Sequence, residues 1–188
     1  SVMSMYGEPS LSSKKIDSAL KEKQKIINKK NYFLIKKEKE IDKWIEEAEE
    51  FGELAIDTET SSLDPHQAEL IGVSLSTQIG KACYIPIGHK SQDCLNKEAI
   101  LKKLKPLLED KSIKKIGQNI KFDVIVLSKH GIKMSCMEDT MLMSYVLDAG
   151  KNRHNMDILS EIHLNHKTIS FKELVGSGKK EINFSEVD

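Results

Sequence analysis

The order of strand-like and helix-like segments limits most strongly what this chain can fold into. Strand-type runs rich in apolar residues lie at residues 32–35, 53–58, 70–76, 82–87 and 113–117. Segments with apolar residues at helical spacing lie at residues 40–50, 96–108, 122–130, 140–147, 156–164 and 171–175, and Asn96 and Asp139 are the expected N-caps of two of them. The strands come first and then alternate with helices, and no internal repeat is present. This order predicts an α/β fold with a mixed β-sheet flanked by α-helices.

Length and composition exclude several classes of protein. The 188 residues suffice for one compact domain, and no apolar run approaches the roughly 20 residues of a membrane span. No apolar segment with a basic start opens the chain, so no secretory signal is expected. Three cysteines without a Cys-x-x-Cys pair argue against a disulfide framework or a zinc knuckle and favour the cytoplasm. The polar residues 1–30 are predicted to be a linker or N-terminal tail, and residues 31–188 the domain.

The charge of the chain is balanced overall but uneven locally. Lys plus Arg and Asp plus Glu each number 29, which gives a formal net charge of zero, whereas nucleic-acid binders often carry a basic excess. Clusters of lysine fit solvated helix faces. Arg153 is the single arginine of the sequence, and its planar guanidinium suits a phosphate or a carboxylate. A chance surface position explains it equally well on this ground alone.

Two acidic residues lie at the end of the strand predicted for residues 53–58. Because side chains alternate along a strand, Asp57 and Glu59 project to the same side, roughly 7 Å apart. Such a pair resists burial unless a cation lies between the carboxylates, and hard oxygen ligands suit Mg²⁺ or Mn²⁺. A solvated strand end is the alternative, and the short Asp-x-Glu pattern alone favours it.

A third acid follows the predicted strand at residues 113–117. Asp123 lies in the first turn of the next helix, at the end of the run GQNIKFD at residues 117–123. A carboxylate there interacts favourably with the helix dipole, by about 0.3–1 kcal/mol. The functional alternative is a carboxylate that faces Asp57 across neighbouring elements.

Together these segments resemble a known family. Residues 57–64 (DTETSSLD) and 117–123 are similar to the first and second motifs of the DnaQ-like (DEDD) 3′–5′ exonucleases. Residues 153–159 (RHNMDIL) and 166–171 (HKTISF) further resemble the proofreading domains of bacterial DNA polymerase I. The resemblance covers the chain from about residue 31 to its last residue. It implies a ribonuclease H-like fold.

The resemblance also implies two-metal phosphodiester hydrolysis with two divalent cations, Mg²⁺ or Mn²⁺. Asp57 would bridge both ions, Glu59 would hold the first ion and orient the attacking water, and Asp123 would support the second. The single-stranded 3′ end of DNA would contact Thr58, Leu63, Asn119, Lys121, Arg153 and Phe171. Ordinary core packing is the alternative for Leu63 and Phe171, and the methionines at residues 134, 137, 141 and 143 are expected in the core together with Cys136.

The third motif of the family, with its fourth aspartate, is not found. Residues 184–188 (FSEVD) imitate the Tyr-x-x-x-Asp spacing with Phe in place of Tyr, but they fall too early and we reject them. The sequence therefore predicts a domain truncated before this motif, with weak metal binding and low activity. We expect a monomer that acts beside a polymerase domain of the same parent chain. The alternatives are a ribonuclease D-like exoribonuclease and a catalytically silent packing domain of a polymerase.

Overall fold

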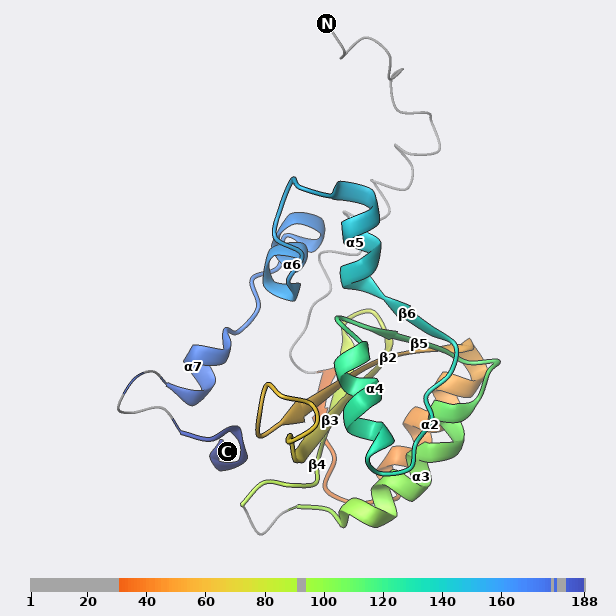
Figure 1. Cartoon of the computed structure of the whole chain (residues 1–188). Helices are drawn as coiled ribbons and strands as arrows, with labels where there is room; N and C mark the ends of the chain where they lie inside the picture. Colours follow the sequence, from red (N-terminus) through yellow and green to blue (C-terminus); the bar gives the residue numbers. More distant parts are fainter. Residues whose placement is uncertain (1–30, 91–93, 177, 179–181, 188) are drawn as a thin grey trace, which may run out of the picture.

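The computed structural model describes residues 31–90, 94–176, 178 and 182–187 (Figure 1). The predicted linker at residues 1–30 lies outside these described residues. Among the helices of these described residues, none has the length and apolar character needed to cross a membrane.

Within the described residues, six strands form one mixed sheet in the order β1-β4-β3-β2-β5-β6. The strands are β1 (Tyr32–Leu34), β2 (Glu53–Thr60), β3 (Leu70–Gln78), β4 (Lys81–Pro86), β5 (Lys114–Gly117) and β6 (Met137–Asp139). β3 pairs antiparallel with β2 and β4, whereas β1–β4, β2–β5 and β5–β6 are parallel pairs. The predicted mixed sheet is confirmed. The three-residue β6 was not predicted, because so short a strand carries no periodic pattern.

The predicted helices are confirmed with small shifts of their ends. They are α2 (Glu40–Phe51), α3 (Lys97–Glu109), α4 (Lys121–Ser128), α5 (Thr140–Asp148), α6 (Met156–Leu164) and α7 (Phe171–Val175), and a 3₁₀ turn, η5, spans Phe184–Glu186. The Asn96 side chain caps α3 as expected, by accepting a hydrogen bond from the Ala99 backbone N–H. Pro106 lies in the last turn of α3, so the helix ends within one turn of the residue that has no backbone N–H to donate.

The core lies between the sheet and its helices. α2 packs against β2 and β3 and beside α3, because Ile41, Trp44 and Ala48 recur at three- and four-residue spacing and are buried. Figure 1 shows α4 lying over the sheet, with α5 and α6 beyond the β6 edge. These last two helices therefore extend away from the main core.

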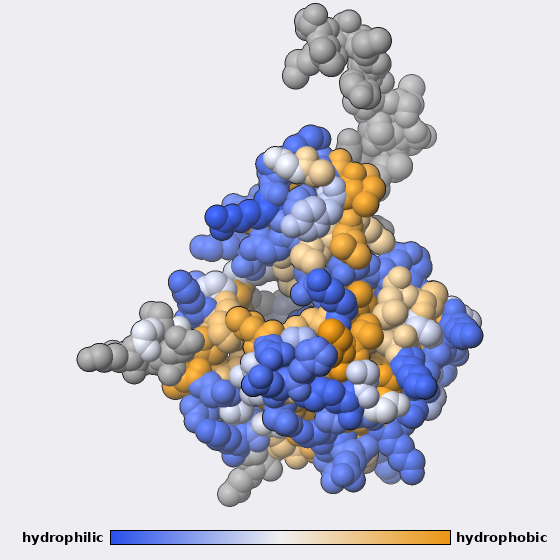
Figure 2. All heavy atoms as spheres, viewed as in Figure 1, coloured by the Kyte–Doolittle hydropathy of each residue, from blue (hydrophilic) through white to orange (hydrophobic). Residues whose placement is uncertain are grey.

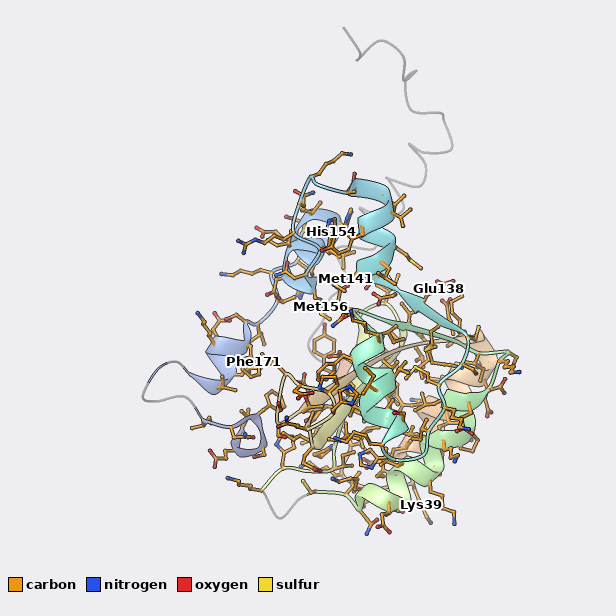
Figure 3. All side chains as sticks on the ribbon, viewed as in Figure 1. Lys39, Glu138, Met141, His154, Met156 and Phe171 are labelled. Carbon is orange, nitrogen blue, oxygen red and sulfur yellow. The ribbon has the colours of Figure 1, made fainter. Side chains whose placement is uncertain are left out.

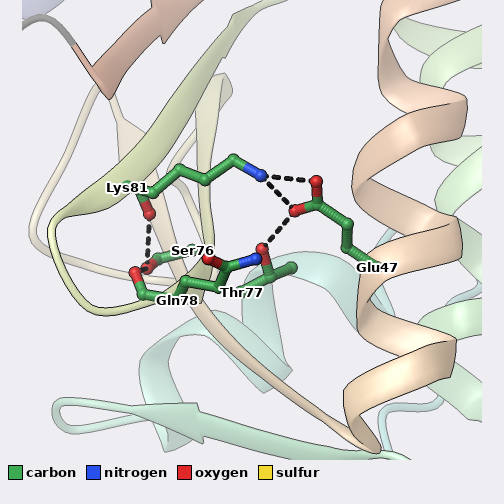
Figure 4. A network of polar contacts seen from close by, with 5 residues as sticks. All are labelled: Glu47, Ser76, Thr77, Gln78 and Lys81. Atoms are coloured by element: carbon green, nitrogen blue, oxygen red, sulfur yellow. Dashed lines mark hydrogen bonds and ion pairs between the residues drawn. The ribbon is translucent and has the colours of Figure 1, made fainter.

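A polar network joins α2 to the β3–β4 hairpin (Figure 4). Glu47 of α2 accepts hydrogen bonds from Lys81 Nζ (2.5 Å to Oε2) and from Thr77 Oγ1 (2.7 Å). The Lys81 ammonium also lies 5.0 Å from the centre of the Trp44 ring, a cation–π geometry. Ser76 Oγ donates to Lys81 O across the turn (2.8 Å). These contacts hold the hairpin, and with it the register of β4.

The outer helix α5 carries apolar side chains that the described chain leaves exposed. No residue of α5 is buried, and Val146 and Leu147 are 85% and 78% exposed. A cavity of about 840 Å³ lies between α4, β6 and α5, and Figure 2 shows hydrophobic residues gathered along α5. The expectation that Cys136, Met137 and the methionines of α5 fill the core is therefore wrong, since only Met134 of that group is buried.

Candidate active site

The two predicted acids of β2 lie where the strand leaves its neighbour β5. The parallel β2–β5 pairing ends at Ala55 opposite Ile116, so Asp57 and Glu59 project beyond it. Because β2 and β5 are parallel, the segment that follows β5 emerges at the same edge of the sheet. The sheet topology thus brings the second motif, which follows β5, to the acid pair.

The Asp123 carboxylate is bound to the residue between those two acids. Its Oδ1 accepts a hydrogen bond from the Thr58 backbone N–H (2.9 Å) and another from Thr58 Oγ1 (2.6 Å). Asp123 is 2% exposed and Thr58 is 7% exposed. Residues that are 65 positions apart in sequence therefore meet, and three carboxyl groups lie at one end of the sheet.

Burial and mutual repulsion shape the titration of this acid group. Burial, together with the neighbouring Glu59 carboxylate, raises the pKa of Asp57 to about 6. Burial, reinforced by the charge of Asp57, raises the pKa of Asp123 to about 6 as well, although the Thr58 hydrogen bonds oppose the rise. The pKa of Glu59 is also raised, by burial and by Asp123. The ionised form of each of these carboxyl groups is thus destabilised by a neighbouring carboxylate. Keeping all three ionised is costly without a compensating positive charge.

The chemistry of the donors fits a hard divalent cation. Carboxylate oxygens are the ligands that Mg²⁺ and Mn²⁺ prefer, and a cation would relieve the repulsion that raises these pKa values. Within residues 31–90, 94–176, 178 and 182–187, however, no three His, Cys, Asp or Glu side chains surround one point closely enough to hold a metal ion as they stand. The Oδ1 atom of Asp123 is engaged by Thr58, which leaves Oδ2 for other ligands.

Four of the predicted nucleic-acid residues are exposed. Leu63 is 96% exposed and Phe171 is 56% exposed, so ordinary core packing does not account for either. Phe171 projects from α7 (Figure 3), and its ring stacks on Phe184 with centroids 6.1 Å apart. Lys121 and Arg153 are exposed.

Thr58 and Asn119 are placed differently from the exposed residues. Both donors of Thr58 bind Asp123, so in this structure Thr58 holds a carboxylate. Asn119 has a positive φ of 56°, and within the described residues its Oδ1 is the one buried side-chain polar atom without a hydrogen-bond partner. Such an orphaned oxygen is costly, which makes it a candidate acceptor for a ligand.

Two supporting residues escaped the sequence reasoning. Asp139, expected only as a helix cap, also accepts hydrogen bonds from the backbone amides of Asn119 (2.9 Å) and Ile120 (3.1 Å). Gln118 donates from Nε2 to the His154 carbonyl (2.7 Å), and Figure 3 shows His154 between α5 and α6. These contacts fix the second motif and tie it to the loop that carries Arg153. The polar character of Gln118 and Asp139 at the ends of their strands was the sequence signal for a supporting role. Their hydrogen-bond partners are remote in sequence, so the local pattern did not identify them.

The comparisons with known proteins now identify the family. The family model described as 3′–5′ exonuclease matches residues 32–187. DNA polymerase I of Rhizobium leguminosarum is 42% identical over 169 residues, which cover 79% of this chain and 16% of that protein. The chain belongs to the 3′–5′ exonuclease family of DNA polymerase I. The corresponding protein of Pseudomonas aeruginosa is 40% identical over 152 residues, which cover 78% of this chain and 17% of that protein. The exonuclease domain thus spans about a sixth of these relatives.

Solved structures agree on the fold of this exonuclease domain. Brucella melitensis NrnC with bound Mg²⁺ is 25% identical with a TM-score of 0.55, covering 84% of this chain and 74% of that one. Trypanosoma brucei RNase D in complex with RNA U12 has a TM-score of 0.63 at 16% identity, covering 80% of this chain and 52% of that one. The second likeness concerns the fold alone. The predicted ribonuclease H-like fold is confirmed.

Proposed function

We propose that this domain removes nucleotides from the single-stranded 3′ end of DNA as the proofreading part of a longer DNA polymerase I. The observation that carries the proposal is the binding of Asp123 to Thr58, which gathers Asp57, Glu59 and Asp123 at one end of the sheet. Membership of the exonuclease family supports the same reaction class. The polymerase domain in the same parent chain, the monomeric state and the cytoplasmic location belong to this proposal.

The three acids would hold two divalent cations, Mg²⁺ or Mn²⁺. Bound ions of this kind stabilise the attacking and leaving oxygens of an in-line phosphodiester displacement. Asp57 would serve both ions, Glu59 the first and Asp123 the second. Thr58 keeps Asp123 in place by its two hydrogen bonds, and Glu59 would accept a hydrogen bond from the attacking water.

Exposed residues around the acids suit a substrate that is read without regard to base sequence. Leu63 and Phe171 offer exposed apolar surfaces on which bases can stack. Lys121 and Arg153 supply positive charge for phosphates, and the unpaired Asn119 oxygen would meet the terminal nucleotide. The DNA polymerase relatives favour DNA over the RNA of a ribonuclease D-like enzyme.

We further propose that the 188-residue chain is a weak enzyme. The domain would comprise residues 31–188, preceded by a linker, and the fourth carboxylate of the family would be missing from it. In residues 184–188, which imitate the Tyr-x-x-x-Asp spacing, Phe184 stands in place of the tyrosine, and Asp188 lies outside the described residues. With three carboxylates, the affinity for the second ion and the rate would both be low.

A single-turnover assay tests the proposal, with the 188-residue chain in excess over a 3′-labelled oligonucleotide and with Mn²⁺ or Mg²⁺. We expect slow release of single nucleotides from the 3′ end that Asp57→Asn abolishes. Asp64→Asn is the matched control, because it makes the same chemical change at an exposed residue. A thermal shift with Mn²⁺ should appear in the wild type and vanish in Asp57→Asn. The absence of both nucleotide release and the metal-linked thermal shift would indicate a silent packing domain. Release of nucleotides from RNA but not from DNA would indicate the ribonuclease.

A further inference from the structure

The hydroxyl group of Tyr84 lies over the strand position opposite Glu59. Glu59 pairs with Gly72 in the β2–β3 register. Tyr84 pairs with Ser74, which lies two residues beyond Gly72 on β3 and therefore on the same face of the sheet. A Cβ atom built on Gly72 would lie 1.9 Å from Tyr84 Oη, so the ring leans across the glycine into the space of its missing side chain. Cβ positions of directly paired residues lie about 4.5–5.5 Å apart on one face of a sheet. The Tyr84 oxygen therefore faces the Glu59 side chain.

A tyrosine hydroxyl is protonated and neutral at physiological pH. The Tyr84 hydroxyl can therefore serve only as a hydrogen-bonding group.

His89 fixes the direction of that hydroxyl. Tyr84 Oη lies 2.6 Å from His89 Nε2, and His89 Nδ1 lies 3.1 Å from the Val187 carbonyl oxygen. A carbonyl only accepts, so Nδ1 carries the proton, and in the neutral ring Nε2 then accepts from the Tyr84 hydroxyl. The Tyr84 oxygen is left with its lone pairs, one of which can accept a hydrogen bond on the Glu59 side.

The C-terminal segment holds His89 in this position. The Phe184 ring lies 5.9 Å from the His89 ring, the Lys90 backbone N–H donates to Ser185 O (2.9 Å), and Lys90 forms an ion pair with Glu186. Residues 184–187 thus contribute to the site by supporting His89, although their sequence only imitates a metal-binding motif.

We propose that Tyr84 is a positioning residue whose oxygen, oriented by His89, accepts a hydrogen bond from the water molecule that Glu59 binds. The inference rests on the proposed exonuclease function. A water that donates one hydrogen to Glu59 and the other to Tyr84 has its lone pair directed away from both acceptors. Fixing that direction favours attack on the phosphorus, and misplacement of a reacting atom by about 1 Å can cost about 100-fold in rate.

Tyr84→Phe tests this role because it removes only the oxygen. We expect it to lower the single-turnover rate at saturating oligonucleotide by about 10- to 100-fold, while the half-saturating DNA concentration and the Mn²⁺-linked thermal shift stay within twofold of the wild type. Tyr32→Phe, at an exposed ring on β1, is the matched control and should change nothing. A Tyr84→Phe rate within twofold of the control, in a chain whose activity Asp57→Asn abolishes, overturns the inference and leaves the proposed function standing. Absence of any Asp57-dependent release overturns both.

A readout without metal or substrate keeps the inference testable even where Tyr84→Phe does not fold. Nitrogen NMR of the wild-type histidines should show neutral His89 as the Nδ1–H tautomer, and in a folded Tyr84→Phe the Nε2 resonance should move as its hydrogen bond is lost. An Nε2–H tautomer in the wild type would mean that the Tyr84 oxygen accepts from His89 instead, and would overturn the inference.

Discussion

Replacing Asp57 by asparagine should stabilise the metal-free chain at neutral pH and at the same time abolish metal-linked stabilisation. The reason lies in the acid group itself. Asp57 sits at the end of β2 beside Glu59, where burial and repulsion raise its pKa to about 6. An asparagine has nearly the same shape but no charge to desolvate or repel.

The size and the pH range of the effect follow from that pKa. A rise of the Asp57 pKa from 3.8 to about 6 corresponds to about 3 kcal/mol of folding free energy. This is an upper limit on the stabilisation expected from Asp57→Asn, because the asparagine amide must also be desolvated. The folded-state pKa lies above the unfolded value, so the folded chain binds this proton more tightly. The stability that Asp57 contributes is therefore present below about pH 4 and is lost as the pH rises to about 6 and beyond.

Urea unfolding in EDTA measures the effect at pH 4 and pH 8. We expect the free energy of unfolding of Asp57→Asn to exceed that of the wild type by about 2–3 kcal/mol at pH 8 and by less than about 1 kcal/mol at pH 4. Asp64→Asn, at an exposed position, should differ little from the wild type at either pH. A pH-independent difference, or an Asp57→Asn chain no more stable than the wild type at pH 8, would refute the claim that Asp57 is buried among repelling carboxylates.

Three further changes probe the supports and the surface of the site. Thr58→Val removes one hydrogen bond to Asp123; it should cost about 1–3 kcal/mol in urea unfolding at pH 8, and unchanged stability would contradict the contact. Asp139→Ala removes an acceptor shared by backbone amides at the starts of α4 and α5, so a loss of about 2–4 kcal/mol is expected in the same assay. Phe171→Ala should weaken binding of a single-stranded oligonucleotide by about 1–3 kcal/mol in fluorescence anisotropy. Phe51→Ala, at another partly exposed ring, should leave that affinity unchanged, and equal losses in both would remove Phe171 from the substrate path.

Local sequence patterns sufficed for the elements and for the candidate acids. The apolar spacing of α2 and α3, the caps at Asn96 and Asp139, and the alternation along β2 depend on residues within a few positions of each other. The same alternation put Asp57 and Glu59 on one side of their strand. These features are set by helix and strand periodicity, which any stretch of chain carries with it.

The tertiary structure decided which of these residues meet. Thr58 and Asp123 are joined only because β2 and β5 are parallel neighbours, and the Tyr84 hydroxyl faces Glu59 only because Gly72 leaves room in the β3–β4 register. The exposure of Phe171 and the position of the short β6 were likewise beyond the local pattern. Sheet order, register and the space left by an absent side chain arise from contacts between distant segments, and periodicity within one segment carries no information about its partner.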